Sequence, residues 1–214
     1  MAVTTIVQLM MGVSLAACCG LRAWMPMLIV GLLAKAGYVH LSPSFSFLVR
    51  TDALIVFSVA TVLELLGDKV IVIDHFLDAV GTIVRPAAGT ILASAMLTHL
   101  DPVTATTFGL IAGGAPAFTI HAGKAVARAK TSLFAHFHAG TGNAVLSTLE
   151  DVLTIGGVFL AAFLPILAFV LVLPALALVI WMIVHLVRKG VNVWTYLANR
   201  KSRKPVPASQ PISS

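Results

Sequence analysis

The stretch AACCGLRAWMP, residues 16–26, interrupts the first apolar run of the chain with cysteine, glycine, arginine and proline. Its small residues before Cys18 match a signal-peptide cleavage site, so one interpretation is a secreted lipoprotein. A signal peptide also needs a positively charged N-terminal region, and the first ten residues contain no Lys or Arg. We therefore favour a break within the membrane. Residues 5–21 are just long enough to cross a bilayer, and residues 22–26 then redirect the chain.

The composition places this break in a membrane protein. Of the 214 residues, 59% are hydrophobic and 10% are charged, and the mean hydropathy is +1.01. A soluble domain has about 25% charged residues, so this chain has too few charges to cover a water-exposed surface. The sequence predicts an all-α, polytopic transmembrane helix bundle whose surrounding partner is the lipid bilayer.

Apolar stretches predict about six spans, some of them broken helices. The stretches are 5–35, 53–66, 87–99, 103–120, 144–164 and 166–187. Because a span needs about 20 residues, the second and third stretches are expected to extend into the polar segment 67–86. The last two stretches are continuous in apolarity and too long for one crossing. We expect a hairpin that turns near Pro165, in preference to Pro174.

The positive charges indicate which segments lie in the cytoplasm. Residues 1–187 are expected to form the transmembrane domain and 188–214 a basic cytoplasmic tail, disordered at its end. Six of the fourteen Lys and Arg residues lie in this tail, and six spans then place the N-terminus in the cytoplasm too. The predicted external segments hold only Lys35 and Arg50. This uneven distribution argues for a membrane rather than a nucleic acid as the partner.

Two short matching segments indicate an internal repeat. Glu64 and Glu150 each follow a hydroxyl residue and a leucine, and they lie 38 and 34 residues after Pro26 and Pro116. Halves of three spans each would be inverted in the membrane, as in many secondary transporters. These halves are 1–100 and 101–187. Because the match is short, a coincidence is the alternative interpretation.

Ionisable residues would share one face if residues 61–80 formed a single helix. Each residue of a helix advances about 100°, and four further ionisable side chains then point in nearly the same direction as Glu64. They are Asp68, His75, Asp78 and, at the edge of the stripe, Asp74. The stripe is either the solvated face of an interfacial helix or the lining of a polar cavity that relays protons or holds a cation. Arg85, which precedes Pro86, is interpreted only as part of a helix start.

Further charges interrupt the predicted fourth and fifth spans and complete a candidate pathway for a substrate or ion. A charge at the centre of a membrane helix costs about 2.5–3.5 kcal/mol on insertion scales, so it is usually paired or turned toward water. The pathway residues are Arg22, Glu64, Asp68, His121, Lys124, Arg128, Glu150 and Asp151. We expect Arg22 to face Glu64 or Glu150. Salt bridges that only fix helix packing are the alternative.

No cofactor or metal is predicted for the chain. The sequence contains no compact His/Asp/Glu cluster with the ligand number of a catalytic zinc site. It also contains no phosphate-binding loop, dinucleotide turn or serine-hydrolase motif.

Five motifs in order resemble the bacterial membrane proteins grouped as domain-of-unknown-function family 4126. They are GLRAWMP at 20–26, DK at 68–69 with Asp74, RPxxG at 85–89, HxxKAxxR at 121–128 and SxxED at 147–151. The resemblance covers about residues 10–187 and implies a small multi-pass protein of the bacterial inner membrane, with no activity attached. The paired Cys18 and Cys19 depart from the expected small residues such as Ala.

Three classes of function remain open. We favour a small secondary transporter or channel-like protein, not an enzyme, whose carboxylates bind a proton or cation and whose basic groups pair with them or hold an anionic substrate. The second class is a non-transporting scaffold or assembly protein. The third is an intramembrane enzyme that acts on a lipid at Asp74, His75 and Asp78. A hydrated cavity that reaches Glu64 and Glu150 would favour transport, whereas dry, paired charges would favour the scaffold. The substrate and a homo-oligomeric state stay open.

Overall fold

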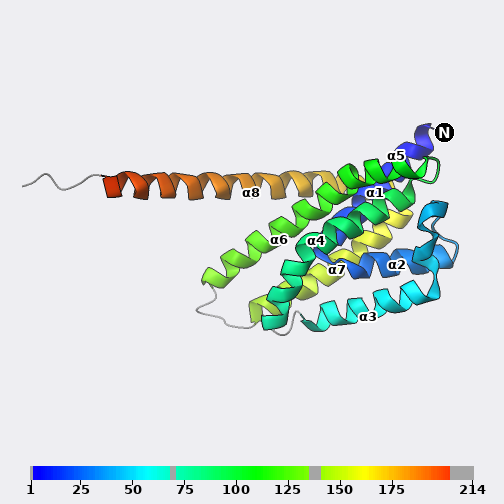
Figure 1. Ribbon diagram of the computed structural model, residues 1–214, viewed down its shortest axis with the longest axis horizontal. Coiled ribbons are helices and arrows are strands. Elements are labelled where there is room, and N and C mark those ends of the chain that lie inside the picture. Colours follow the sequence, from blue (N-terminus) through cyan, green and yellow to red (C-terminus); the bar gives the residue numbers. More distant parts are fainter. Residues whose placement is uncertain (1, 68–70, 135–140, 203–214) are drawn as a thin grey trace, which may run out of the picture.

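The computed structural model describes residues 2–67, 71–134 and 141–202, with side chains described over 3–67, 77–126 and 147–189. Every regular element in these ranges is a helix, as predicted (Figure 1). The elements are α1 (Ala2–Leu21), α2 (Trp24–Lys35), η1 (Pro43–Val49), α3 (Thr51–Gly67), α4 (Ile71–Met96), α5 (Pro102–Gly109), η2 (Leu110–Gly114), α6 (Ala115–Phe134), α7 (Thr141–Phe163) and α8 (Pro165–Ser202).

The predicted break after the first apolar run is confirmed. Helix α1 ends at Leu21, and α2 begins at Trp24 and runs back toward the end of the bundle where α1 starts (Figure 1). Pro26 lies in the first turn of α2, where its missing N–H removes no hydrogen bond within the helix. The adjacent Cys18 and Cys19 are buried free thiols on the last turn of α1.

The bundle has two distinct ends. The first, called here the amino end, holds the start of α1, the connection after α2 and the end of α4. There Gln8 Nε2 donates to Thr98 Oγ1 at 2.7 Å, and Ser42 N donates to Ala95 O at 2.8 Å. The second, called here the charged end, holds the ends of α1 and α3, the first part of α4 and the start of α7 (Figure 1).

The predicted turn at Pro165 is confirmed. Helix α7 ends at Phe163 and α8 begins at Pro165, whereas Pro174 lies inside α8, so the alternative turn there is wrong. Helix α8 runs from the amino end past the charged end and continues to Ser202 (Figure 1). Helix α8 therefore continues beyond Val187, the last residue of the predicted final apolar stretch. The described start of α1 and end of α8 lie at opposite ends of the bundle.

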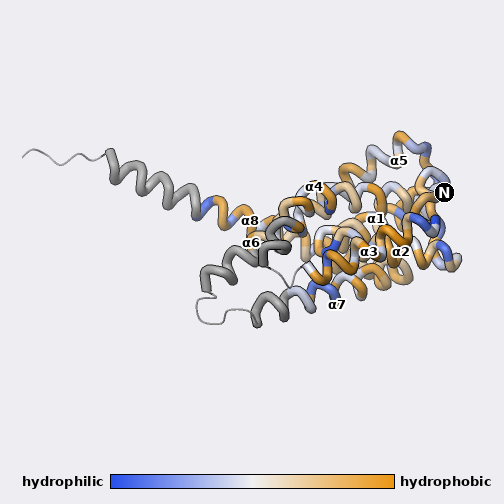
Figure 2. The backbone as a smooth tube through the Cα atoms, turned by 60° about the horizontal axis from the view of Figure 1, so that its bottom comes forward, coloured by the Kyte–Doolittle hydropathy of each residue, from blue (hydrophilic) through white to orange (hydrophobic). Residues whose placement is uncertain are grey.

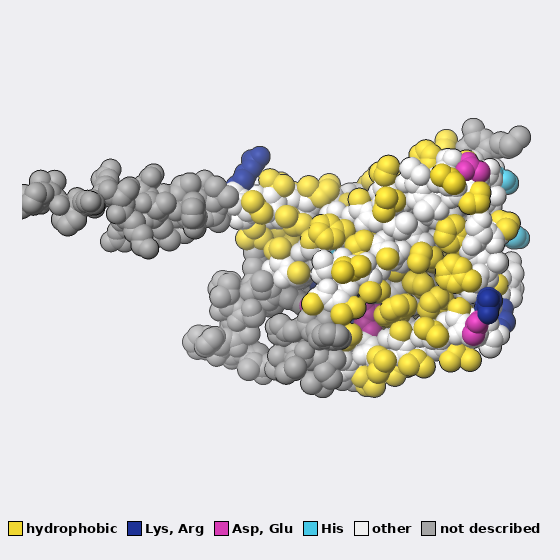
Figure 3. Space-filling view, viewed as in Figure 1, with side chains coloured by type: hydrophobic (Ala, Val, Ile, Leu, Met, Phe, Trp, Pro, Cys, Tyr) yellow, Lys and Arg dark blue, Asp and Glu magenta, His cyan; other side chains and the backbone are white. Residues whose placement is uncertain are grey.

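The apolar helices indicate a membrane protein. Among the described residues, four segments are long and apolar enough to cross a bilayer. They are Val3–Leu21, Leu77–Met96, Pro102–Val126 and Pro165–Lys189. A fifth results if η1 and α3, which meet at 60°, count as one bent span. Hydrophobic residues dominate α1, α2 and α3 in Figure 2 and cover the middle of the face in Figure 3. Six spans and the inverted repeat stay predictions.

Small residues let α4 approach both α1 and the continuous helix formed by α5, η2 and α6. A Cβ added to Gly12 of α1 would lie 3.0 Å from Ala93 Cα, and one added to Gly89 would lie 2.8 Å from Gly113 O. Such close backbone approach is typical of membrane helices, because lipid provides no hydrophobic drive for helix association. Gly113 belongs to η2, a π-helical turn between α5 and α6.

Candidate functional site

Arg22 lies in the break between α1 and α2 and is completely buried. Its Nη2 lies 2.7 Å from Asp151 Oδ1 and donates to Ser147 Oγ at 2.9 Å. Its Nη1 donates to the backbone oxygen of Glu64 at 3.4 Å. The prediction that Arg22 faces the carboxylate of Glu64 or Glu150 is corrected to Asp151. Neighbouring residues on a helix point about 100° apart, so Asp151 and Glu150 reach different partners.

The carboxylate of Glu64, near the end of α3, binds the start of α2. Oε1 accepts a hydrogen bond from Ala23 N at 3.2 Å, and Oε2 accepts one from Trp24 N at 3.5 Å. The first N–H groups of a helix have no partner within it and carry a partial positive charge. Ala23, the N-cap residue, supplies no side-chain hydrogen bond, so Glu64 performs this capping role from another helix.

Arg85, in the interior of α4, connects three further groups and is 2% exposed. Its Nη2 lies 3.4 Å from Glu64 Oε1, and its Nη1 lies 3.5 Å from Asp78 Oδ1. Nη1 also contacts His121 Nδ1 of α6. Because guanidinium only donates hydrogen bonds, His121 Nδ1 is the acceptor. The other ring nitrogen, His121 Nε2, lies 3.2 Å from Thr82 Oγ1.

Lys124 and Glu150 form a third buried connection, between α6 and α7. Lys124 Nζ lies 2.8 Å from Glu150 Oε2, and the two side chains are 3% and 6% exposed. Lys124 Nζ also donates to the backbone oxygen of Leu21 at 3.4 Å, directly before the break in α1. Glu150 is held on its own helix by the hydroxyl of Thr154, which donates to Glu150 O at 2.7 Å.

These residues form one cluster at the charged end, called here the charged network. Its members are Arg22, Glu64, Asp78, Arg85, His121, Lys124, Glu150 and Asp151. Among the described side chains, the network contains three bases, four acids and His121. Asp78 and Asp151 are 28% and 26% exposed and form its rim, while the other charged members are buried.

The predicted helical stripe over residues 61–80 is wrong. Helix α3 ends at Gly67 and α4 begins at Ile71, and the residues between them lie outside the described ranges. Glu64 and Asp78 nevertheless come together, because both contact Arg85. Asp68 lies outside the described residues. Three predicted residues belong to helices, but their side chains lie outside the description: Asp74, His75 and Arg128.

Sequence reasoning missed Arg85 and left Ser147 outside the predicted site. The pair Arg85-Pro86 was interpreted as a helix start, yet Pro86 lies inside α4. A better signal was available, because Arg85 lies within an apolar segment long enough to span a bilayer. An ionisable residue in such a segment is by default a candidate functional residue. Among the described side chains, no group of three or more His, Cys, Asp or Glu could hold a metal ion.

The model of the family described as a domain of unknown function, DUF4126, matches residues 9–185. The match covers most of the chain, and it confirms the resemblance inferred from the five motifs. No curated protein and no solved structure matches the chain. The chain belongs to the DUF4126 family.

Proposed function

We propose that this DUF4126 protein is a small secondary transporter or channel-like protein of the bacterial inner membrane. In this proposal, the charged network binds a proton or a small cation during transport. The placement of four acids beside three bases, with two of the acids partly exposed, supports it. A charge held in an apolar medium is costly, so ionisable residues buried in a membrane segment are by default candidates for a functional site.

The distribution of exposure in the network suggests a route for the ion. Asp78 and Asp151, which form the rim, are the more exposed acids, while Glu64 and Glu150 lie deeper. An ion that enters at the rim would reach the inner carboxylates by displacing Arg85 or Lys124 from them. Chains of ionisable residues act as proton relays in membrane pumps and transporters.

The positive charges support an orientation for this protein. Arg188 and Lys189 of α8 are exposed, and four more basic residues follow them in sequence. The positive-inside rule then places the charged end in the cytoplasm. Because α1 starts at the opposite end of the bundle, the N-terminus would face the outside. This proposal replaces the cytoplasmic N-terminus expected from six spans.

A scaffold or assembly protein is the second candidate. It is favoured by the pairing of the network, because Glu64, Asp78, Glu150 and Asp151 each lie within 3.5 Å of a basic group. Charge pairs of this kind can serve only to fix which helices pack together. However, replacing a buried ion pair with apolar residues is often neutral or stabilising, so packing alone does not account for so many buried charges.

Ion flux into proteoliposomes tests the transport proposal. We expect the wild-type protein to pass H⁺, Na⁺ or K⁺ faster than empty liposomes, followed with an internal pH dye and with radioactive Na⁺ and Rb⁺. Glu64→Gln and Glu150→Gln remove network carboxylates and should slow the flux by at least about tenfold, the loss that ~1.4 kcal/mol of ion binding produces.

The control is Asp52→Asn, which alters an exposed acid paired with Arg50, remote from the charged network. This variant should transport as the wild type does. Wild-type flux equal to that of empty liposomes for all three ions would contradict the proposal, as would unchanged flux in both Gln variants.

A further inference from the structure

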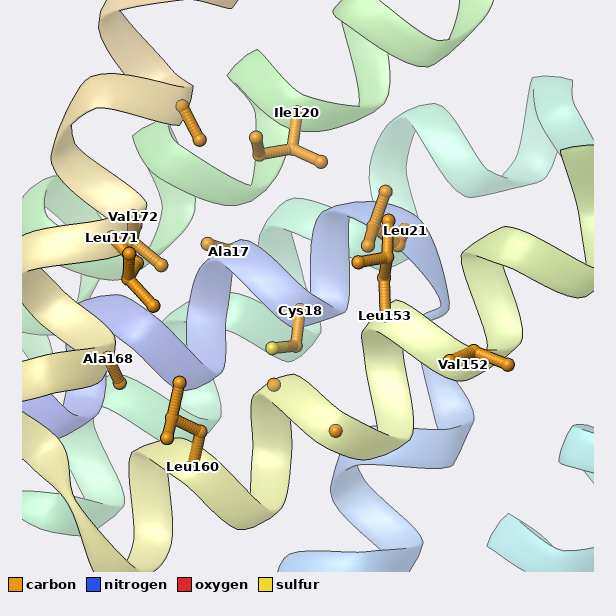
Figure 4. A pocket seen from close by; sticks show the side chains of 13 residues that line it. Ala17, Cys18, Leu21, Ile120, Val152, Leu153, Leu160, Ala168, Leu171 and Val172 are labelled. Atoms are coloured by element: carbon orange, nitrogen blue, oxygen red, sulfur yellow. The ribbon is translucent and has the colours of Figure 1, made fainter.

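An apolar groove of about 440 Å³ lies between α1, α6, α7 and α8 (Figure 4). In Figure 4, Ala17 and Cys18 of α1 lie near the centre, with Ile120 of α6 above them. Leu171 of α8 lies to the left and Leu153 of α7 to the right. None of the described side chains that line the groove is charged. The groove uses none of the residues of the charged network, so it is a separate feature of the bundle.

Small residues on α7 and α8 create this groove. A Cβ added to Gly156 would meet no atom within 4 Å, whereas one added to Gly157 would lie 2.7 Å from Cys18 Sγ. Gly156 therefore faces open space, and Gly157 packs against α1. Across the groove, α8 contributes Ala168 and Ala175, which leave room where larger residues would close it.

The groove is continuous with the lipid-facing surface of the bundle. Its lining includes Val152, Leu153 and Leu171, which are more than half exposed. In a bilayer, these side chains face acyl chains rather than water. A water-soluble ligand would have to cross lipid to reach the groove, whereas an acyl chain is already beside it.

The volume of the groove suits one acyl chain better than a helix from a second copy of the protein. A helix about 10 Å wide that crosses a bilayer of about 30 Å occupies on the order of 2,000 Å³, several times the volume of the groove. Sites for small ligands measure about 300–1,000 Å³. The groove falls within that range.

We propose that this groove binds one acyl chain of a bilayer phospholipid. The chain lies along Gly156 between α7 and α8 and contacts the side of Cys18. This proposal does not depend on ion transport, because it concerns an apolar site at which no ion is bound.

Photo-crosslinking in lipid nanodiscs tests this site. The probe is a phosphatidylglycerol with a diazirine in one acyl chain, and the labelled peptides are identified by mass spectrometry. We expect labelling of the α1 and α7 segments that line the groove to exceed labelling of the exposed face of α8 around Ile180. Gly156→Leu and Ala175→Leu each fill the groove, and should lower groove labelling about tenfold, the effect of ~1.4 kcal/mol.

The matched control is Ala177→Leu, an equal change on the same helix as Ala175 but at an exposed position outside the lining. It should leave groove labelling unchanged, and thermal unfolding of each variant checks that the bundle is intact. Equal labelling of the groove and the exposed face of α8 would overturn the proposal, as would full groove labelling in both filled variants. Crosslinks between two copies through the groove would also overturn it.

Discussion

The two ends of the bundle hold helices together by different means. Toward the amino end, α4 meets η2 through backbone contact, at Gly89 and Gly113. At the charged end, α1, α3, α4, α6 and α7 are joined by side-chain ion pairs around Arg22, Arg85 and Lys124. Lipid is as apolar as the helices, so neither end is held by the hydrophobic effect, and both depend on close packing or polar bonds.

This difference shows what each end requires of the sequence. The glycine contacts require only the absence of a side chain, and any added atom disturbs them. The ion pairs require particular partners, and a variant that removes one partner leaves the other buried and uncompensated. Substitutions at the two ends should therefore differ in whether a second substitution can rescue them.

We expect the largest effect from Arg85→Met. It leaves the Glu64 carboxylate without its guanidinium partner, and breaking a buried pair costs about 3–5 kcal/mol. Chemical unfolding in detergent micelles measures the loss. Adding Glu64→Gln to Arg85→Met removes the uncompensated charge and should recover much of the stability, whereas Arg85→Met with wild-type stability would show that the pair contributes nothing.

Gly113→Ala should destabilise the bundle by about 1–3 kcal/mol, the usual cost of overpacking. The added Cβ would overlap the backbone oxygen of Gly89, which cannot rotate away. The matched control is Gly156→Ala, whose Cβ meets no atom within 4 Å. Equal unfolding midpoints for the two variants would refute the close contact between α4 and η2.

Ser147→Ala should have a smaller effect, about 0.6 kcal/mol, the average for hydrogen bonds between membrane helices. It removes the hydroxyl that accepts from Arg22 at 2.9 Å. Ser58→Ala is the control, because the Ser58 hydroxyl donates to Leu54 O within its own helix. The free energy of unfolding of both variants is measured in the same detergent. A larger loss of unfolding free energy for Ser58→Ala than for Ser147→Ala would contradict this prediction.

The smallest effect concerns Asp101, which caps α5 at the amino end. Hydrogen bonds from the Thr104 hydroxyl and backbone N–H lower the pKa of the Asp101 carboxyl. A carboxyl with a lowered pKa in the folded state stabilises it above the ordinary carboxyl range, and this contribution is lost as the pH falls through the lowered value. As the pH falls into the acidic range, backbone hydrogen exchange at the start of α5 should therefore become faster in the wild-type protein relative to the Asp101→Asn variant. Parallel pH profiles for the two proteins would contradict this role.

Local signals predicted much of the fold. The glycine, arginine and proline of residues 20–26 identified the break after α1, and Pro165 identified the turn before α8. Both are consequences of backbone chemistry within a few residues, which the sequence displays directly. The stripe over residues 61–80 failed because it depended on a single helix, whereas Glu64 of α3 and Asp78 of α4 both lie beside Arg85.

The pairing within the candidate site could not be predicted. Arg22 and Ser147 are 125 positions apart, and only tertiary packing determines that Asp151, rather than Glu150, faces the break. The residue types were nevertheless informative, since predicted charges such as Arg22, Glu64, His121 and Lys124 came together in the network. Arg85 was missed because its neighbour Pro86 was interpreted as the start of a helix, and the charge of Arg85 within an apolar segment was not considered.

An exchange of charges between Lys124 and Glu150 tests the central claim most directly. The pair lies at 2.8 Å and is almost completely buried, so Lys124→Glu and Glu150→Lys alone should each destabilise the protein. The double variant restores a pair of opposite charges but moves the carboxylate to α6. We predict recovery of the unfolding midpoint without recovery of ion flux in proteoliposomes. Recovery of wild-type flux together with stability would contradict the account, because Glu150 would then serve packing alone.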